Sequence, residues 1–93
     1  MTSLFYNNYI QRLLDETDLD TLVKVGDYLG TNRQRINDFK YGGLRATGEE
    51  CEKIAQKLGL SFEEVDFTQC YDKAKNDADA DVFQKYINKH KKN

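Results

Sequence analysis

Proline and tryptophan are absent from this sequence, and glycine is scarce, with six residues among 93. So few turn-forming residues disfavour an all-β fold, which needs many tight turns. No hydrophobic run approaches the roughly 18 residues that a membrane span requires. The N-terminus has neither the cationic start nor the apolar block of a secretory signal. We therefore expect a cytoplasmic protein that contacts no membrane.

Reactive side chains are equally few. Cys51 and Cys70 allow one disulfide, whereas a secreted protein of this size usually carries more, so we expect two reduced thiols that act as small hydrophobes. His90 is the single histidine and lies in a polar tail. A metal site would lack ligands, and a cysteine–histidine nucleophile would lack a plausible pair. We expect neither an enzyme nor a cofactor.

Hydrophobic residues make up 39% of the chain and recur three and four residues apart, which is the spacing of amphipathic helices. This pattern predicts an all-α fold of five or six short helices in one small domain. Candidate N-caps precede the helices: Ser3, Asp18 or Asp20, Thr31 or Asn32, Thr47, Ser61 and Asp79. Glutamates three residues after Thr47 and Ser61 give both starts the form of a capping box.

The net charge of −2 conceals segments of opposite sign. Residues 31–48 hold four basic residues and one acidic residue, net +3, whereas residues 49–81 hold four basic and ten acidic residues, net −6. Residues 82–93 add four lysines and no acid. A local basic segment can bind nucleic acid even in an acidic protein, because the local field acts at contact. From the charge pattern alone, a solvated surface is the simpler interpretation.

The segment 22–41 has the spacing of a helix-turn-helix. Gly26 is the small residue that the first helix needs where its neighbour crosses closely, and Gly30 allows the sharp turn four residues later. Ile36 and Phe39 form the narrow apolar stripe of the next helix, so we expect them to be buried while its other residues face solvent. Such a pair of helices supports the second one for entry into a DNA major groove.

The stretch 25–42 (VGDYLGTNRQRINDFKYG) resembles the helix-turn-helix of the lambda-repressor-like, Cro-type DNA-binding regulators, in particular small phage-related ones. Downstream, residues 46–50 (ATGEE) and 54–61 (IAQKLGLS) resemble the following helix of that family. The resemblance implies a helix-turn-helix DNA-binding domain over 1–75, followed by a C-terminal helix and basic tail over 76–93.

The resemblance also implies a set of DNA contacts. The base-reading residues would be Arg33, Gln34, Asn37 and Asp38. The phosphate-binding residues would be Thr31, Asn32, Arg35, Lys40, Tyr41 and Arg45. These side chains suit the task, because arginine pairs with guanine and amides pair with adenine, while contacts to phosphates carry affinity but no sequence. Two alternatives stay open: Gln34 completes a capping box if Thr31 is the N-cap, and Asp38 orients Arg33 or Arg35 or simply faces solvent.

We therefore expect a transcriptional regulator, a phage or mobile-element repressor, that binds double-stranded DNA in a sequence-specific manner. One recognition helix contacts few base pairs, so we expect a homodimer on a palindromic operator. The dimer surface would come from later helices that carry Phe67, Tyr71, Phe83, Tyr86 and Ile87. The alternative is a small phage protein that uses the same fold to inhibit a host protein or a repressor through the acidic 49–81 surface.

Overall fold

The computed structural model describes residues 2–42 and 44–91, and these residues form helices and no strand. The elements are η1 (Tyr6–Ile10), α1 (Gln11–Glu16), α2 (Leu22–Leu29), α3 (Arg33–Asp38), η2 (Phe39–Tyr41), α4 (Gly48–Leu58), α5 (Phe62–Asp72) and α6 (Asp77–His90). The π-helical η1 runs directly into α1, and η2 is a single 3-10 turn that continues α3. The predicted all-α class is confirmed. Gly43 lies outside the described residues, as do Lys92 and Asn93 of the expected basic tail.

The helix starts follow local hydrogen bonding. Thr47 forms the predicted capping box with Glu50, and the Ser3 hydroxyl accepts from the Tyr6 amide at 3.1 Å. Ser61 accepts from the amide of Glu64 at 3.2 Å. Within the described hydrogen bonds, however, the Glu64 carboxylate does not return to Ser61, because it accepts instead from the buried Tyr9 hydroxyl at 2.8 Å.

Two predicted N-caps are wrong. Thr21, not Asp18 or Asp20, caps α2, because Thr21 directly precedes the first helical residue and its hydroxyl accepts from the Lys24 amide at 3.1 Å. The carboxylates of Asp18 and Asp20 pair instead with Lys57 and Lys24, at 2.7 and 2.8 Å. Helix α6 begins earlier than expected.

The N-cap of α6 is Asn76, whose side-chain oxygen accepts from the amide of Asp79 at 2.9 Å. An asparagine is as good a cap as an aspartate, so the first turn of α6 takes in Asp77 and Asp79. The residues just before the predicted cap Asp79 are therefore helical from Asp77 onward.

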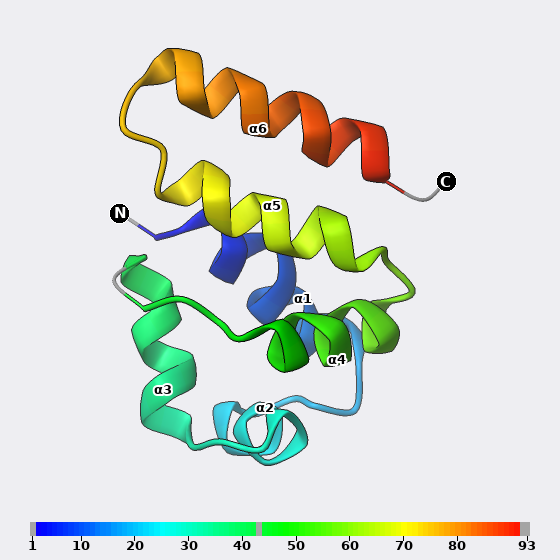
Figure 1. Cartoon of the computed structure of the whole chain (residues 1–93). Coiled ribbons are helices and arrows are strands. Elements are labelled where there is room, and N and C mark those ends of the chain that lie inside the picture. The colour runs from blue at the N-terminus through cyan, green and yellow to red at the C-terminus, as the bar shows by residue number, and fades with distance from the viewer. Residues whose placement is uncertain (1, 43, 92–93) are drawn as a thin grey trace.

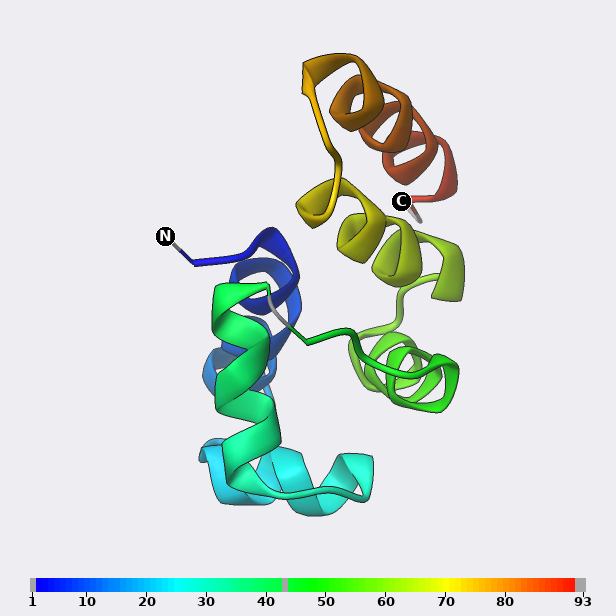
Figure 2. The ribbon, with the colours of Figure 1, turned by 60° about the vertical axis from the view of Figure 1, so that its left-hand side comes forward.

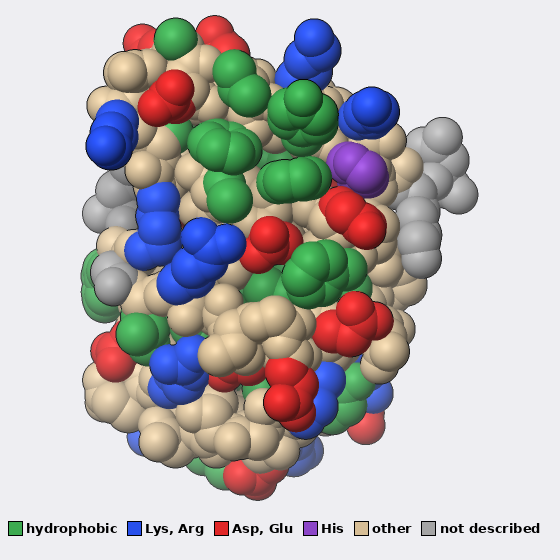
Figure 3. Space-filling model, in the orientation of Figure 1, with side chains coloured by type: hydrophobic (Ala, Val, Ile, Leu, Met, Phe, Trp, Pro, Cys, Tyr) green, Lys and Arg blue, Asp and Glu red, His purple; other side chains and the backbone are tan. Residues whose placement is uncertain are grey.

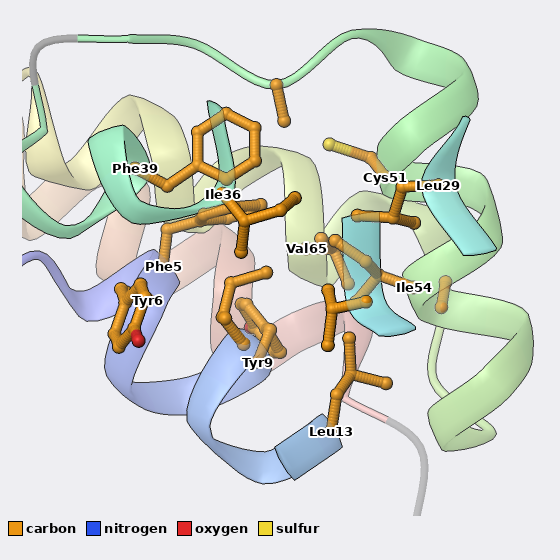
Figure 4. Close-up of a cluster of buried hydrophobic side chains, with 14 of the residues drawn as sticks. Phe5, Tyr6, Tyr9, Leu13, Leu29, Ile36, Phe39, Cys51, Ile54 and Val65 are labelled. Carbon is orange, nitrogen blue, oxygen red and sulfur yellow. The ribbon is translucent and has the colours of Figure 1, made fainter. Parts of the chain in front are cut away.

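One hydrophobic core joins η1 to α5 (Figure 4). Its largest fully buried side chains come from every helix of this part of the chain: Tyr9, Phe39, Ile10, Leu13, Ile36, Ile54, Val25 and Val65. The ring of Phe5 meets that of Phe39 edge-on, with centroids 5.4 Å apart. The predicted burial of Ile36 and Phe39 is thus confirmed. Because these two side chains point into the core, the opposite side of α3 faces outward.

Helix α5 ties the N-terminus and the segment after η2 to this core. The Asp72 carboxylate accepts hydrogen bonds from the amides of Leu4 and Phe5, both at 2.9 Å. The Gln69 side-chain oxygen accepts from the Ala46 amide at 2.7 Å. These bonds stabilise the start of the first helix and the approach to α4.

Helix α6 lies beside α5 at the end of the molecule opposite α2 (Figures 1 and 2). It buries Ile87, and the ring of Tyr86 lies 5.7 Å from that of Phe67 on α5. None of the helices in the described ranges combines the length and the apolar character needed to cross a membrane.

Candidate nucleic-acid interface

The turn between α2 and α3 has the close contact that the sequence predicts. Gly30 has φ +80° and ends α2 in the left-handed region, and the Thr31 amide then donates to the carbonyl of Gly26 at 2.8 Å. A Cβ atom placed on Gly26 would lie 3.0 Å from the carbonyl carbon of Asn32 and 3.2 Å from the amide nitrogen of Arg33. Since both atoms are backbone, only a glycine fits here without displacing α3.

Asn32 is the N-cap of α3, and its side-chain oxygen accepts from the Arg35 amide at 3.0 Å. The alternative in which Thr31 caps the helix and Gln34 completes a capping box is therefore wrong. Because the Asn32 oxygen is used by the cap, the predicted phosphate contact of this residue would have to come from its side-chain NH₂ group.

The four predicted base-reading residues lie on the outward side of α3. Arg33 and Gln34 are exposed, whereas Asn37 and Asp38 are half-buried. The Gln34 amide nitrogen donates to the Asp38 carboxylate at 2.9 Å. Asp38 thus orients Gln34. The roles considered for Asp38 from the sequence did not include this one. Arg33 makes no ion pair or side-chain hydrogen bond within the described part of the chain, and shares an open hollow with Asn32, Gln34 and Asn37.

The predicted phosphate-binding residues divide into two groups. Thr31 is half-buried at the turn, Tyr41 is 70% exposed, and the ammonium of Lys40 lies 5.5 Å from the centre of the Tyr6 ring. These three leave polar groups at the surface.

The arginines of that set are engaged within the fold. Arg35 donates to both carboxylate oxygens of Glu50, at 2.7 and 2.9 Å, and its guanidinium lies over the Phe39 ring. Arg45 donates to Asp66 at 3.2 Å but keeps half of its side chain exposed. Arg35 therefore joins α3 to α4, while Arg45 retains access to solvent.

The Arg35–Glu50 pair lies behind the exposed face of α3. Burial of Glu50 opposes its ionisation, but hydrogen bonds from Arg35 and the Thr47 amide outweigh this, so the pKa of Glu50 lies below its ordinary value. The carboxylate serves the cap of α4 and the arginine of α3 at once. It thereby sets the position of α3 relative to α4.

Two residues beside this face were missed by the sequence reasoning. The ammonium of Lys53 on α4 would lie 3.9 Å from a Cβ on Gly30, next to the α2–α3 turn. Val23 is 54% exposed and lines a hollow with Arg33. A valine at this position of the first turn of α2 departs from the amphipathic pattern, and this departure could have indicated an exposed hydrophobic side chain. Nothing local in the sequence indicates the place of Lys53.

The sequence matches no protein-family model, and comparisons with curated proteins and with solved structures yield no match either.

Proposed function

We propose that this protein is a sequence-specific double-stranded DNA-binding regulator of transcription with a lambda-repressor-like helix-turn-helix, in which α3 reads the major groove. The observation that carries the proposal is the close approach of α3 to Gly26, combined with the burial of Ile36 and Phe39. This packing holds a short helix rigidly by one side and presents arginine and amide side chains on the other. A polar outer face is common to surface helices, so the support for DNA reading is its chemistry: arginine and amide groups suited to base edges, on a helix held against α2 by a close backbone contact.

Within this proposal, Arg33 is the principal base reader, because it is exposed and has no partner among the described residues. Gln34, oriented by Asp38, and Asn37 lie beside it. Lys40, Tyr41, Thr31 and Arg45 contact phosphates. We leave Arg35 out of the DNA contacts, since its guanidinium is held by Glu50, and assign it the positioning of α3.

The charges of the acidic segment also bear on the choice of function. Several carboxylates of 49–81 are used inside the fold: Glu50 binds Arg35, Glu64 binds the Tyr9 hydroxyl, Asp66 binds Arg45 and Asp72 binds the first helix. These four are therefore withdrawn from an acidic docking surface. A protein partner remains the alternative to DNA, because the other six carboxylates of the segment are exposed: Glu49, Glu52, Glu63, Asp77, Asp79 and Asp81.

Selection of bound duplexes from a random pool at near-physiological salt tests the proposal. We expect a palindromic consensus, because the proposed regulator is a homodimer that doubles one short reading helix by symmetry. Recovery of no duplex, together with specific capture of a protein partner, would contradict DNA reading.

Arg33→Ala on the selected operator identifies the reading helix. We expect a loss of about 1–3 kcal/mol per half-site and relaxed specificity at one base pair. Lys40→Ala should weaken all duplexes alike and reduce the salt slope by about one unit. The matched control is Arg12→Ala on α1, whose side chain pairs with Glu16 and lines a groove together with Gln84 of α6 and Lys91, the residue after α6. Equal effects of Arg33→Ala and Arg12→Ala would exclude α3 as the reader.

A further inference from the structure

Helix α6 carries an outward stripe that its packing on α5 leaves uncovered. Asp79, Val82, Tyr86 and Lys89 follow one another at spacings of three, four and three residues, so they share one face of the helix. All four are exposed, with Val82 at 50% and Tyr86 at 42%. Ile87 marks the opposite, buried side. Two large hydrophobic side chains thus keep about half of their surface in solvent between an acid and a base.

The apolar centre of this stripe is continuous with side chains of α5. The ring of Phe67 lies 5.7 Å from the rings of both Tyr86 and His90. Figure 3 shows hydrophobic side chains gathered over α5 and α6 on this face, with charged groups around them. A patch of this form, with an apolar centre and a charged rim, is typical of a protein–protein contact.

The stripe is complementary to itself when reversed. Asp79 and Lys89 lie five residues on either side of position 84, and Val82 and Tyr86 lie two residues on either side of it. A two-fold axis at that level brings Asp79 opposite Lys89 and Val82 opposite Tyr86. Each contact then occurs twice, as it does in every isologous interface. The two ends of α6 also differ in charge, with Asp77, Asp79 and Asp81 before this level and Lys85 and Lys89 after it.

We propose that α6 packs antiparallel against α6 of a second copy of this chain. In this arrangement Asp79 faces Lys89 of the partner subunit, and Val82 faces Tyr86 of the partner subunit, each contact occurring twice. A parallel arrangement would bring Asp79 against its own counterpart and Lys89 against its own, and both pairs would repel. The order of charges along α6 therefore favours pairing with a second copy of the same helix and favours the antiparallel direction over the parallel one.

This pairing deepens the homodimer part of the proposed function and rests on it, but it requires no DNA. Because α6 lies at the end of the molecule away from α2, the pairing leaves the α2–α3 face uncovered (Figures 1 and 2). The seam is short, since α6 has 14 residues and a length of about 21 Å. We expect a weak interface with a dissociation constant on the order of micromolar in the absence of DNA.

Sedimentation equilibrium of the whole chain without DNA tests the pairing. Wild-type protein should dimerise, whereas Asp79→Lys and Lys89→Asp should each weaken the dimer at least tenfold by placing like charges opposite one another. An equimolar mixture of these two variants should form a heterodimer, because every facing pair again has opposite charge. The double variant Asp79→Lys/Lys89→Asp should restore the homodimer. Only an antiparallel register in which positions 79 and 89 meet predicts both rescues.

The matched control is Asp77→Lys, which makes the same change in the same first turn of α6. Position 77 lies about 160° around the helix from position 79, so the control carries the same penalty at the helix N-terminus and leaves the stripe intact. Val82→Ser provides a second disruptive variant that changes no charge, and circular dichroism checks that each variant keeps its helix content.

Wild-type protein that stays monomeric at several hundred micromolar overturns the pairing, as does an equal effect of Asp77→Lys and Asp79→Lys, or a mixture that forms no heterodimer. These outcomes are distinct from failure of the proposed function. A monomer that still binds a selected operator refutes the α6 pairing alone, whereas a dimer that binds no duplex refutes DNA reading and leaves the pairing intact.

Discussion

The helix pairs α2–α3 and α5–α6 are held together in opposite ways. Backbone meets backbone between α2 and α3, where Gly26 contacts Asn32 and the left-handed Gly30 makes the turn. Side-chain groups of α5 and its N-cap join it to α6: the ring of Phe67 lies beside that of Tyr86, and Ile87 is buried. The hydroxyl of the N-cap Ser61 donates to the His90 carbonyl at 2.6 Å. The first pair shares the main core, whereas the second adds a helix at its margin. A direct contact between backbones thus lies at the face proposed to read DNA, whereas α6 retains apolar surface for another contact.

Phe39→Ala should have the largest effect, because it opens a cavity in the core that α3 shares with η1. Phe39 is 1% exposed and meets Phe5 edge-on, so we expect a loss of about 3–5 kcal/mol in the free energy of unfolding. Urea denaturation followed by circular dichroism measures it. An unchanged midpoint would show that the helix packs by its other side.

Ile87→Ala tests whether α6 is a separate unit at the margin of the core. We expect a loss of about 2 kcal/mol confined to α6, seen as faster hydrogen exchange of its amides while those of α4 keep their protection. Val82→Ala, which shortens an exposed side chain of the same helix, serves as control at concentrations where the protein is monomeric. Equal loss of protection in α4 and α6 would show that the two regions unfold together.

Gly26→Ala tests the close contact between α2 and α3. The added methyl group would meet the backbone of Asn32 at 3.0 Å, so a cost of about 1–3 kcal/mol from overpacking should exceed the gain in helix propensity of about 1 kcal/mol. Thermal unfolding measures the net loss. Gly48→Ala is the matched control, because a Cβ there has no atom within 4 Å in the described structure and the substitution should not destabilise the fold. A neutral Gly26→Ala would mean that α3 moves freely on α2.

Glu50→Gln tests the link between α3 and α4, with the smallest expected effect. Because the folded state lowers the pKa of Glu50, its stabilisation is complete above the ordinary value of 4.5 and is lost as the pH falls below it. We expect the variant to lose about 1 kcal/mol at pH 7, and the difference from wild type to shrink toward pH 3. Urea titrations at several pH values measure this, with Glu49→Gln as the exposed control. A constant difference across pH would exclude the ion pair as its cause.

Features that depend on neighbouring residues were predicted from the sequence. The turn at Gly30, the capping box at Thr47 and the burial of Ile36 and Phe39 were all predicted correctly, because helix periodicity and hydrogen bonds over three or four residues are legible in a linear chain. The two wrong caps also show the limit of local reasoning. Asp18 is close to the start of α2 along the chain, yet its carboxylate binds Lys57 of α4.

Only the tertiary structure decided which polar groups remain available. Arg35 reads as a phosphate contact in the sequence, but the fold brings Glu50 to it from 15 residues away. Asp72 caps the first helix across 68 residues, and Glu64 leaves its own capping box for Tyr9 across 55. No local pattern encodes such partners, because a buried charge or hydroxyl must be satisfied by whatever group the packing of the core places beside it. The sequence thus identified the candidate residues of α3, while the tertiary structure decided which of them stay available, as the hold of Glu50 of α4 on Arg35 shows.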